Sequence, residues 1–224
     1  LVVIPSRPLL RISGTLIANA WKRNDTKYIH EIYRKSCLNQ FIIAAFLFGG
    51  IWINIENILI ILGPEYAGGK WVIFFVGLGY LIDMATGANG QIISYSKHYR
   101  MGLWFLLILI VLVVSAMLIF IPVWGITGAA AAIALAFLMN NFMRFLFLYK
   151  KYNMQPISKK FVGAGCAFLV AFIAGWVIPE FRLIPDILIR SSTFTVFFAA
   201  IILGTKVSED INETVVKIRK RFTK

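Results

Sequence analysis

The sequence predicts an all-α membrane protein, a polytopic helical bundle of six complete transmembrane helices preceded by the end of another helix. Three observations lead to this fold class. Of the 224 residues, 59% are hydrophobic and only 15% are charged, whereas about a quarter of the residues in a soluble domain are charged. Six apolar runs are long enough to cross a bilayer, which takes about 20 residues. The lysines and arginines lie in short clusters between these runs.

Composition and motifs exclude several functional classes. The net charge is +13, but the cations do not form the continuous stripe that nucleic-acid binding requires, so we expect no nucleic-acid partner. Cys37 and Cys166 lie at or inside apolar runs and lack metal-ligand spacing. His30 and His98 fall in connecting loops, and the chain has neither a phosphate-binding glycine loop nor a nucleophile elbow. We therefore expect no metal and no cofactor.

The elements follow one another along the chain with short connections. The chain opens with LVVIPSRPLL, which has no initiator methionine and no basic signal-peptide region. We expect a fragment that begins partway through a helix, with residues 1–20 as the tail of that helix. The six complete spans follow at residues 38–62, 71–93, 101–122, 124–148, 161–178 and 187–204.

Loop charges predict the orientation of these spans. Alternate connections carry five, two, four and six lysines and arginines, and the connections between them carry one, none and one. Basic loops stay in the cytoplasm, so the basic connections and the C-terminus are predicted to face inward. Tryptophans near the predicted span ends fit an aromatic belt at the two interfaces; they are Trp21, Trp71, Trp104, Trp124 and Trp176.

Two basic stretches are amphipathic, and one span begins with small residues. Asn24 or Asp25 can cap a short helix whose apolar side repeats at helical spacing through residue 36. Ile211, Val215, Ile218 and Phe222 repeat in the same way near the C-terminus. We expect both stretches to lie on the inner membrane surface, where anionic lipids attract basic helices. A solvated loop and tail is the alternative. Close helix packing is predicted where four small residues repeat, at Gly125, Gly128, Ala132 and Ala136.

Asp83 is the most unusual residue of the apolar runs. It lies ten residues from the inner end of its span, which is ~15 Å deep at about 1.5 Å per residue. A charge at that depth is costly and usually faces a cavity or a partner. Arg11 is predicted at a similar depth on the first helix, with Arg7 one turn further out on the same face. We expect Asp83 to pair with Arg11 or Arg7 across a polar interior.

Other polar side chains extend this predicted interior. Thr86, Asn89 and Gln91 follow Asp83 along the chain, and Asn140, Asn141 and Arg144 lie toward the inner end of the span at 124–148. Arg144 is alternatively an interfacial cation that extends its side chain toward water. Near the outer end of the span at 38–62, Asn54, Glu56 and Asn57 are expected to be solvated.

The order of several pieces resembles a known family. These are the basic connector AWKRNDTKYIHEIYRKS, the outer turn ILGPEYAGGK, the segment GLGYLIDMATGANGQIISYSKHYR, and the turn and helix PVWGITGAAAA. In this order they resemble the C-terminal half of bacterial oligosaccharide flippases. Those proteins form the polysaccharide-biosynthesis branch of the multidrug/oligosaccharidyl-lipid/polysaccharide exporter superfamily. The resemblance covers nearly the whole chain from Ile12 onward.

The resemblance implies an architecture, a substrate and a location. Residues 1–148 would belong to the C-terminal transporter lobe, from the end of helix 8 to helix 12. Residues 149–204 would form two additional C-terminal helices, and residues 205–224 a basic amphipathic cytoplasmic tail. Such a protein would lie in the bacterial inner membrane. It would move undecaprenyl-diphosphate-linked oligosaccharide outward by alternating access for cell-surface polysaccharide or O-antigen biosynthesis.

The resemblance also bears on the site residues and partners. A cationic cavity would receive the diphosphate, and Arg7 and Arg11 fit that role by charge and predicted depth. Partners would be lipid-linked oligosaccharide and membrane lipids, with possible association with a polysaccharide polymerase or glycosyltransferases. An enzyme is not expected, because the predicted outer loops are only about eight, two and eight residues long and leave little chain for a catalytic site.

Two other functional classes stay open. One is a cation-coupled multidrug exporter of the multidrug and toxin extrusion type, in which acidic residues would face cationic drugs. The other is a non-transporting membrane scaffold, which would need no polar cavity. The deep charges of this chain are mostly basic, which favours the flippase.

The predicted orientation is testable by cysteine labelling in intact cells. After Cys37 and Cys166 are replaced, single cysteines at Gly68 and Arg182 should react with an impermeant maleimide from outside. Single cysteines at Lys151 and Lys220 should react only in opened cells, because basic loops stay inside. The reverse pattern would show that the orientation is wrong.

Overall fold

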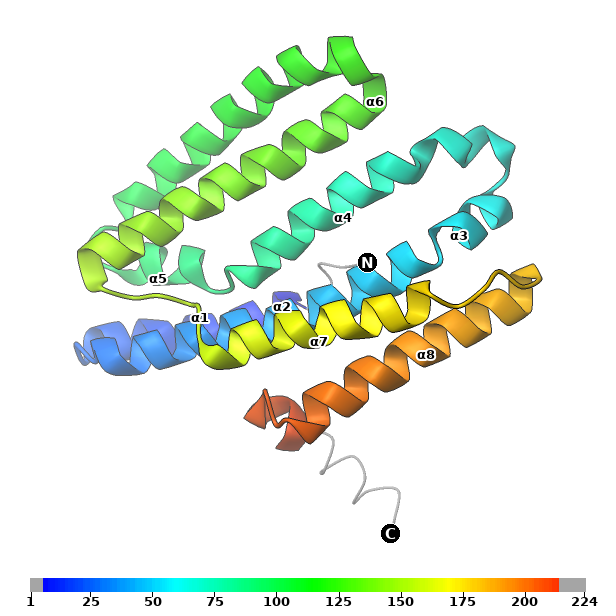
Figure 1. The fold of residues 1–224 in the computed structure, drawn as a ribbon. Coiled ribbons are helices and arrows are strands. Elements are labelled where there is room, and N and C mark those ends of the chain that lie inside the picture. Colours follow the sequence, from blue (N-terminus) through cyan, green and yellow to red (C-terminus); the bar gives the residue numbers. More distant parts are fainter. Residues whose placement is uncertain (1–5, 214–224) are drawn as a thin grey trace.

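The computed structural model describes residues 6–213, without the side chains of residues 6 and 7. This part of the chain is built of helices and connections, with no strand among its elements (Figure 1). The elements in chain order are α1 (Ser6–Lys22), α2 (Thr26–Ile53), α3 (Ile55–Leu62), the 3-10 helix η1 (Pro64–Gly69), α4 (Lys70–Ala85), α5 (Asn89–Tyr95), α6 (Arg100–Tyr152), α7 (Lys159–Trp176) and α8 (Leu183–Gly204). The predicted all-α fold is confirmed for the described residues.

The span predicted at 38–62 is the C-terminal part of a longer, kinked rod. Helix α2 begins at Thr26, because the Asp25 side chain accepts a hydrogen bond from the Tyr28 backbone N–H at 3.0 Å, as an N-cap residue does. Asn54 separates α2 from α3. Its side-chain amide donates to the Gly50 carbonyl at 2.9 Å and to Ser191 Oγ at 3.1 Å. The kink is therefore held to α8 by a hydrogen bond.

The span predicted at 71–93 is broken into α4 and α5. Gly87 lies between them with φ +56°, a backbone conformation that glycine adopts without steric cost. A Cβ at this position would lie 2.7 Å from the Cys37 backbone nitrogen of α2. The positive φ and the close contact with Cys37 both favour glycine over any residue with a side chain. The chain therefore turns here in direct contact with α2.

Helix α6 contains both spans predicted between residues 101 and 148. The chain reverses at Gly125, where φ is 56° and ψ is −133°, and the two arms lie side by side as a hairpin (Figure 1). A Cβ at Gly128 would overlap the Phe120 carbonyl oxygen of the first arm. The reversal predicted near Pro122 is confirmed, and Gly128 permits the close return of the second arm.

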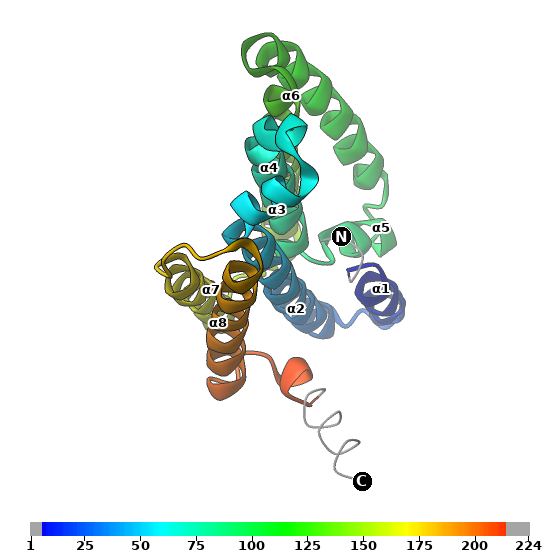
Figure 2. The same ribbon diagram turned by 90° about the vertical axis from the view of Figure 1, so that its right-hand side faces the viewer.

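The helices form two groups joined by α2. The α6 hairpin packs against α4, while α7 and α8 pack against each other and against α2 (Figures 1 and 2). Helix α1 packs against α2 and α5. One apolar core fills the junction of α1, α2, α5 and the part of α6 that holds Phe105 and Leu148, and a second fills the space between α2, α7 and α8. In the second core, Ala164, Ala167 and Ala171 are buried on one face of α7 and let the helices approach closely.

Five of the described helices are long and apolar enough to cross a membrane: α2, the η1–α4 segment, α6, α7 and α8. The first arm of α6 leaves large apolar side chains exposed along its length, including Val111 at 63% and Leu118 at 73%. Water disfavours such a surface, whereas lipid accommodates it. The predicted number of six spans counts the two arms of the α6 hairpin as separate spans, and it remains a prediction.

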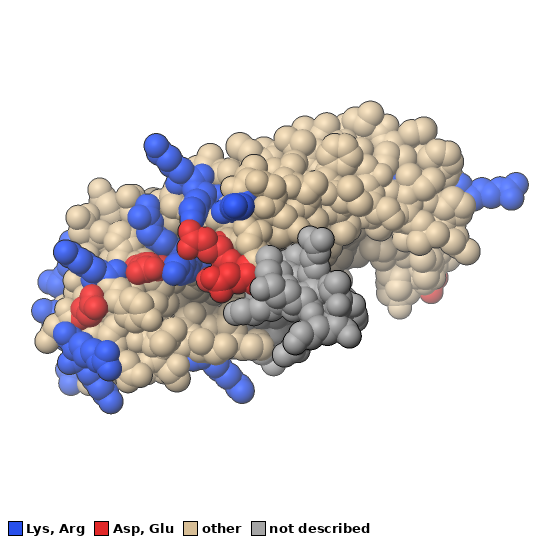
Figure 3. Space-filling view, turned by 90° about the horizontal axis from the view of Figure 1, so that it is seen from below, with Lys and Arg blue, Asp and Glu red and all other residues tan. Residues whose placement is uncertain are grey.

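The charged residues gather toward one end of this apolar body. On the face seen in Figure 3, most lysines and arginines lie over the end that holds the start of α2 and the start of α7, and a broad uncharged zone follows. At the opposite end charged side chains are sparse and of both signs (Figure 3). This distribution is typical of a protein whose basic end faces the cytoplasm.

The prediction that residues 26–36 form a short helix on the membrane surface is wrong. Residues 26–36 are the first turns of α2, and Ile29, Ile32 and Tyr33 are buried against α1 and α5. Their apolar face therefore packs against other helices. The sequence pattern alone cannot distinguish an apolar face that packs against protein from one that contacts lipid. Of the predicted C-terminal amphipathic helix, Val215, Ile218 and Phe222 lie outside the described residues.

The α6 hairpin is testable through Gly128. Gly128→Ala should lower the stability of the protein by about 1–3 kcal/mol, because the added methyl group overpacks the return of the second arm. Gly165→Ala is the matched control: a Cβ at this α7 position meets nothing within 4 Å. Thermal unfolding in detergent, followed by size-exclusion chromatography, measures both variants. Equal unfolding temperatures would contradict the close return of the hairpin.

Candidate functional site

A cluster of polar side chains joins α4, α5 and the second arm of α6. Asn141 is at its centre. Its amide nitrogen donates to Asp83 Oδ1 at 3.0 Å, and its amide oxygen accepts from Thr86 Oγ1 and from Asn89 Nδ2, each at 2.9 Å. The sequence prediction that these four residues share a polar region is consistent with these bonds. The role of Asn141 as the common partner was not predicted.

The local fold brings these side chains together. Helix α4 ends at Ala85, and the Asp83 carbonyl oxygen accepts from the backbone N–H of the C-cap residue Thr86 at 3.3 Å. The single hydroxyl proton of Thr86 is shared between this carbonyl oxygen at 2.8 Å and Asn141 Oδ1 at 2.9 Å. Gly87 then turns the chain, so that Asn89 at the start of α5 faces the same side of α6 as Thr86. An unbroken helix would have separated these residues along its length.

The polar cluster has a buried side, which we call closed, and an exposed side, which we call open. Asn89 and Asn141 are 3% and 2% exposed, whereas Asp83 is exposed. A buried amide that loses its partner costs about 1–3 kcal/mol, so the closed side stabilises one arrangement of α4, α5 and α6. The open side presents a carboxylate at the surface of an apolar helix.

Arg144 lies beside the cluster. Its guanidinium group is within electrostatic reach of Asp83, although the two residues do not form a direct ion pair among the described residues. Arg144 also lines a cavity of about 380 Å³ with Gly90, Ser94 and Tyr99. An arginine beside a cavity and a carboxylate is able to hold an anionic group of a ligand.

The other predicted site residues lie elsewhere. Arg11 is exposed on α1 and forms no ion pair with Asp83 in this structure, and the Arg7 side chain is outside the described part. Gln91 faces α1 beside Gly14. Asn140 is 3% exposed, and its side-chain oxygen has no hydrogen-bond partner among the described residues. The pairing of Asp83 with Arg7 or Arg11 in another conformation stays a prediction.

A second buried polar group lies at the opposite end of the molecule and was missed by the sequence analysis. Asp186 and Arg190 of α8 form an ion pair at 2.8 Å. Asn57 of α3 donates to the same carboxylate at 2.6 Å. The Arg190 guanidinium also donates to the Ile178 carbonyl oxygen at 2.9 Å. Two opposite charges four residues apart in an apolar helix are the sequence signal that was available.

This network corrects the prediction that the asparagines near the predicted outer end of the span at 38–62 are solvated. Asn54 and Asn57 are 5% and 8% exposed. Glu56 fits the prediction, since it is exposed and pairs with Lys70. The asparagines are buried because α8 packs over the kink between α2 and α3.

No cluster of three or more potential metal ligands occurs in the part of the chain that the structure describes. Models of known protein families, curated protein sequences and solved structures give no match to this chain. The class that the fold defines is therefore an all-α protein with several helices apolar enough to span a membrane.

The hydrogen bonds of Asn141 are testable by exchanging donor and acceptor. Asn141→Asp keeps an acceptor for Thr86 and Asn89 but places a second carboxylate against Asp83, so the variant should be less stable. Adding Asp83→Asn should restore stability, because an amide at position 83 can donate to the new carboxylate. Contacting residues typically couple by about 0.5–3 kcal/mol.

Thermal unfolding of the two single variants and the double variant measures this coupling. Asp25→Asn is the matched second substitution: it also removes one carboxylate, but asparagine caps a helix equally well. It should not rescue Asn141→Asp. Additive effects of the substitutions at positions 83 and 141 would show that the two side chains do not interact.

Proposed function

We propose that this chain is part of a flippase that translocates lipid-linked oligosaccharide for cell-surface polysaccharide biosynthesis. The polar cluster around Asn141, with Arg144 beside it, carries the proposal. Polar and charged groups inside apolar helices are costly, and in membrane proteins they commonly mark a substrate or ion pathway. The resemblance of the ordered sequence segments to oligosaccharide flippases supplies the substrate class.

The arrangement of cations supports an anionic substrate. In this structure Asp83 interacts with Asn141 and lies near Arg144, and it leaves Arg11 without an ion pair among the described residues. A diphosphate that crosses a medium of low dielectric needs cations on its path, since unpaired anionic oxygens are costly there. Arginine suits this task because its planar fork binds two phosphate oxygens at once.

One observation favours the cation-coupled exporter as a second candidate. Asp83 presents an exposed carboxylate on an apolar helix, and a carboxylate in this position can bind a cationic drug or a coupling ion. The two candidate functions depend on different residues. In a flippase the arginines would bind a diphosphate, whereas in an exporter Asp83 would bind a cation.

The test is export of surface glycan in cells that depend on the full-length protein. Arg11→Ala should reduce export strongly, and Arg11→Lys only in part, because lysine keeps the charge and loses the two-pronged hydrogen bonding. Arg7→Ala should have the same effect as Arg11→Ala if both arginines line the path. Arg23→Ala, an exposed cation in the connection after α1, is the control.

Protein abundance must be equal in all strains. Normal export with Arg7→Ala and with Arg11→Ala would remove both residues from the proposed path. Normal export combined with a loss of drug resistance in Asp83→Asn would instead identify the exporter.

A further inference from the structure

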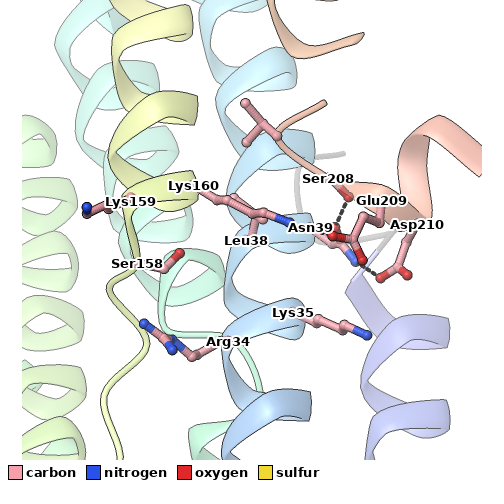
Figure 4. A pocket seen from close by; sticks show the side chains of 11 residues that line it. Arg34, Lys35, Leu38, Asn39, Ser158, Lys159, Lys160, Ser208, Glu209 and Asp210 are labelled. Carbon is pink, nitrogen blue, oxygen red and sulfur yellow. Dashed lines mark hydrogen bonds and ion pairs between the residues drawn. The ribbon is translucent and has the colours of Figure 1, made fainter. Parts of the chain in front are cut away.

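A cavity distinct from the polar cluster lies at the basic end of the molecule, between α2, the start of α7 and the segment after α8. Its volume is about 460 Å³. Arg34 and Lys35 line it from α2, and Lys159 and Lys160 line it from the first turn of α7. Figure 4 shows Arg34, Ser158 and Lys159 on one side of α2 and the acidic residues Glu209 and Asp210 on the other.

The acidic residues neutralise only part of this positive charge. Glu209 Oε1 lies 2.6 Å from the Lys160 ammonium, and this hydrogen bond lowers the pKa of the Glu209 carboxyl below its ordinary value. Asp210 accepts a hydrogen bond from Asn39 at 2.7 Å. Lys35 pairs with Glu31 at 2.9 Å, outside the cavity. Arg34 and Lys159 form no ion pair with a described residue, and both are exposed.

The start of α7 adds backbone donors to these two cations. Ser158 caps the helix by accepting from the Phe161 N–H at 3.1 Å. The two N–H groups that precede Phe161 in this turn, those of Lys159 and Lys160, have no partner within the helix and can attract an anion. Arg34, Lys159 and this helix end therefore line the same side of one cavity, from which the flexible Lys159 side chain is turned away in this structure (Figure 4).

The position of the cavity favours a lipid as its occupant. The apolar stretch of α7 begins directly after Lys160, and that of α8 ends at Gly204, shortly before Val207 and Ser208 of the cavity wall. The cavity thus lies where the apolar surface of the bundle ends. In a bilayer crossed by α7 and α8, this position would be near the lipid headgroups. Leu38 and Val207 supply an apolar wall beside the cations.

We propose that this cavity binds the phosphodiester headgroup of an anionic phospholipid of the inner leaflet, such as phosphatidylglycerol. Arg34 and Lys159 bind the phosphate oxygens, and the lipid tails lie along the exposed apolar faces of α7 and α8. The bound lipid joins α2, α7 and the segment after α8. This proposal concerns a bilayer lipid and does not depend on which substrate the protein transports.

The test uses the purified full-length protein in detergent, titrated with phosphatidylglycerol or phosphatidylcholine. Native mass spectrometry counts bound lipids, and thermal unfolding measures stabilisation. Phosphatidylglycerol should bind preferentially, and Arg34→Gln and Lys159→Gln should each weaken its binding about fivefold, the effect expected for one cation near an anionic lipid surface. Lys150→Gln and Lys151→Gln, which remove exposed cations from the end of α6, should leave binding unchanged.

Glu209→Gln separates a binding role from a structural role. The substitution removes the carboxylate that neutralises Lys160, so phosphatidylglycerol binding should become stronger, although the variant loses an ion pair. Weaker binding in Glu209→Gln would overturn the proposal.

The remaining outcomes are equally decisive. Equal losses in the Arg34, Lys159, Lys150 and Lys151 variants would overturn the site in favour of general surface electrostatics. Equal stabilisation by inorganic phosphate or glycerol 3-phosphate would show that a soluble anion, and not a lipid, occupies the cavity.

Discussion

The need to satisfy every backbone hydrogen bond without water is the constraint on which this structure depends. In the hydrocarbon region an unpaired N–H or C=O group costs several kcal/mol, so a chain that crosses it must be helical. The described segments that are long and apolar enough to cross it are helical. At two helix starts, the side chains of Asp25 and Ser158 replace missing backbone bonds.

The same constraint gives the few interior polar residues their importance. Asn141 uses both its donor and its acceptor on three neighbours, and these bonds link the break between α4 and α5 to the α6 hairpin. The Asp186–Arg190 pair and Asn57 provide a comparable link between α8 and α3. Apolar packing alone allows helices to slide or rotate, whereas a buried polar group has one favourable register.

The sequence is sufficient to predict the helices and much of the polar cluster. Apolar runs predict the helices because length and hydrophobicity are local properties. Asp83, Thr86, Asn89 and Asn141 stand out because polar residues are rare in such runs. Their partners could not be predicted, because partner choice depends on how each helix is rotated. The break at Gly87 and the burial of the first turns of α2 depend on close contacts with other helices, which local sequence does not encode.

The central claim is that the α6 hairpin crosses a bilayer with the Asn141 cluster inside it. Spin labels at Leu118 and Phe142, two exposed positions on the first and second arms, test this claim after reconstitution of the full-length protein into lipid vesicles. Both labels should collide frequently with molecular oxygen and rarely with a water-soluble nickel chelate, whereas a label at Lys150 should show the opposite preference. Frequent collisions of the Leu118 and Phe142 labels with the nickel chelate would contradict the account.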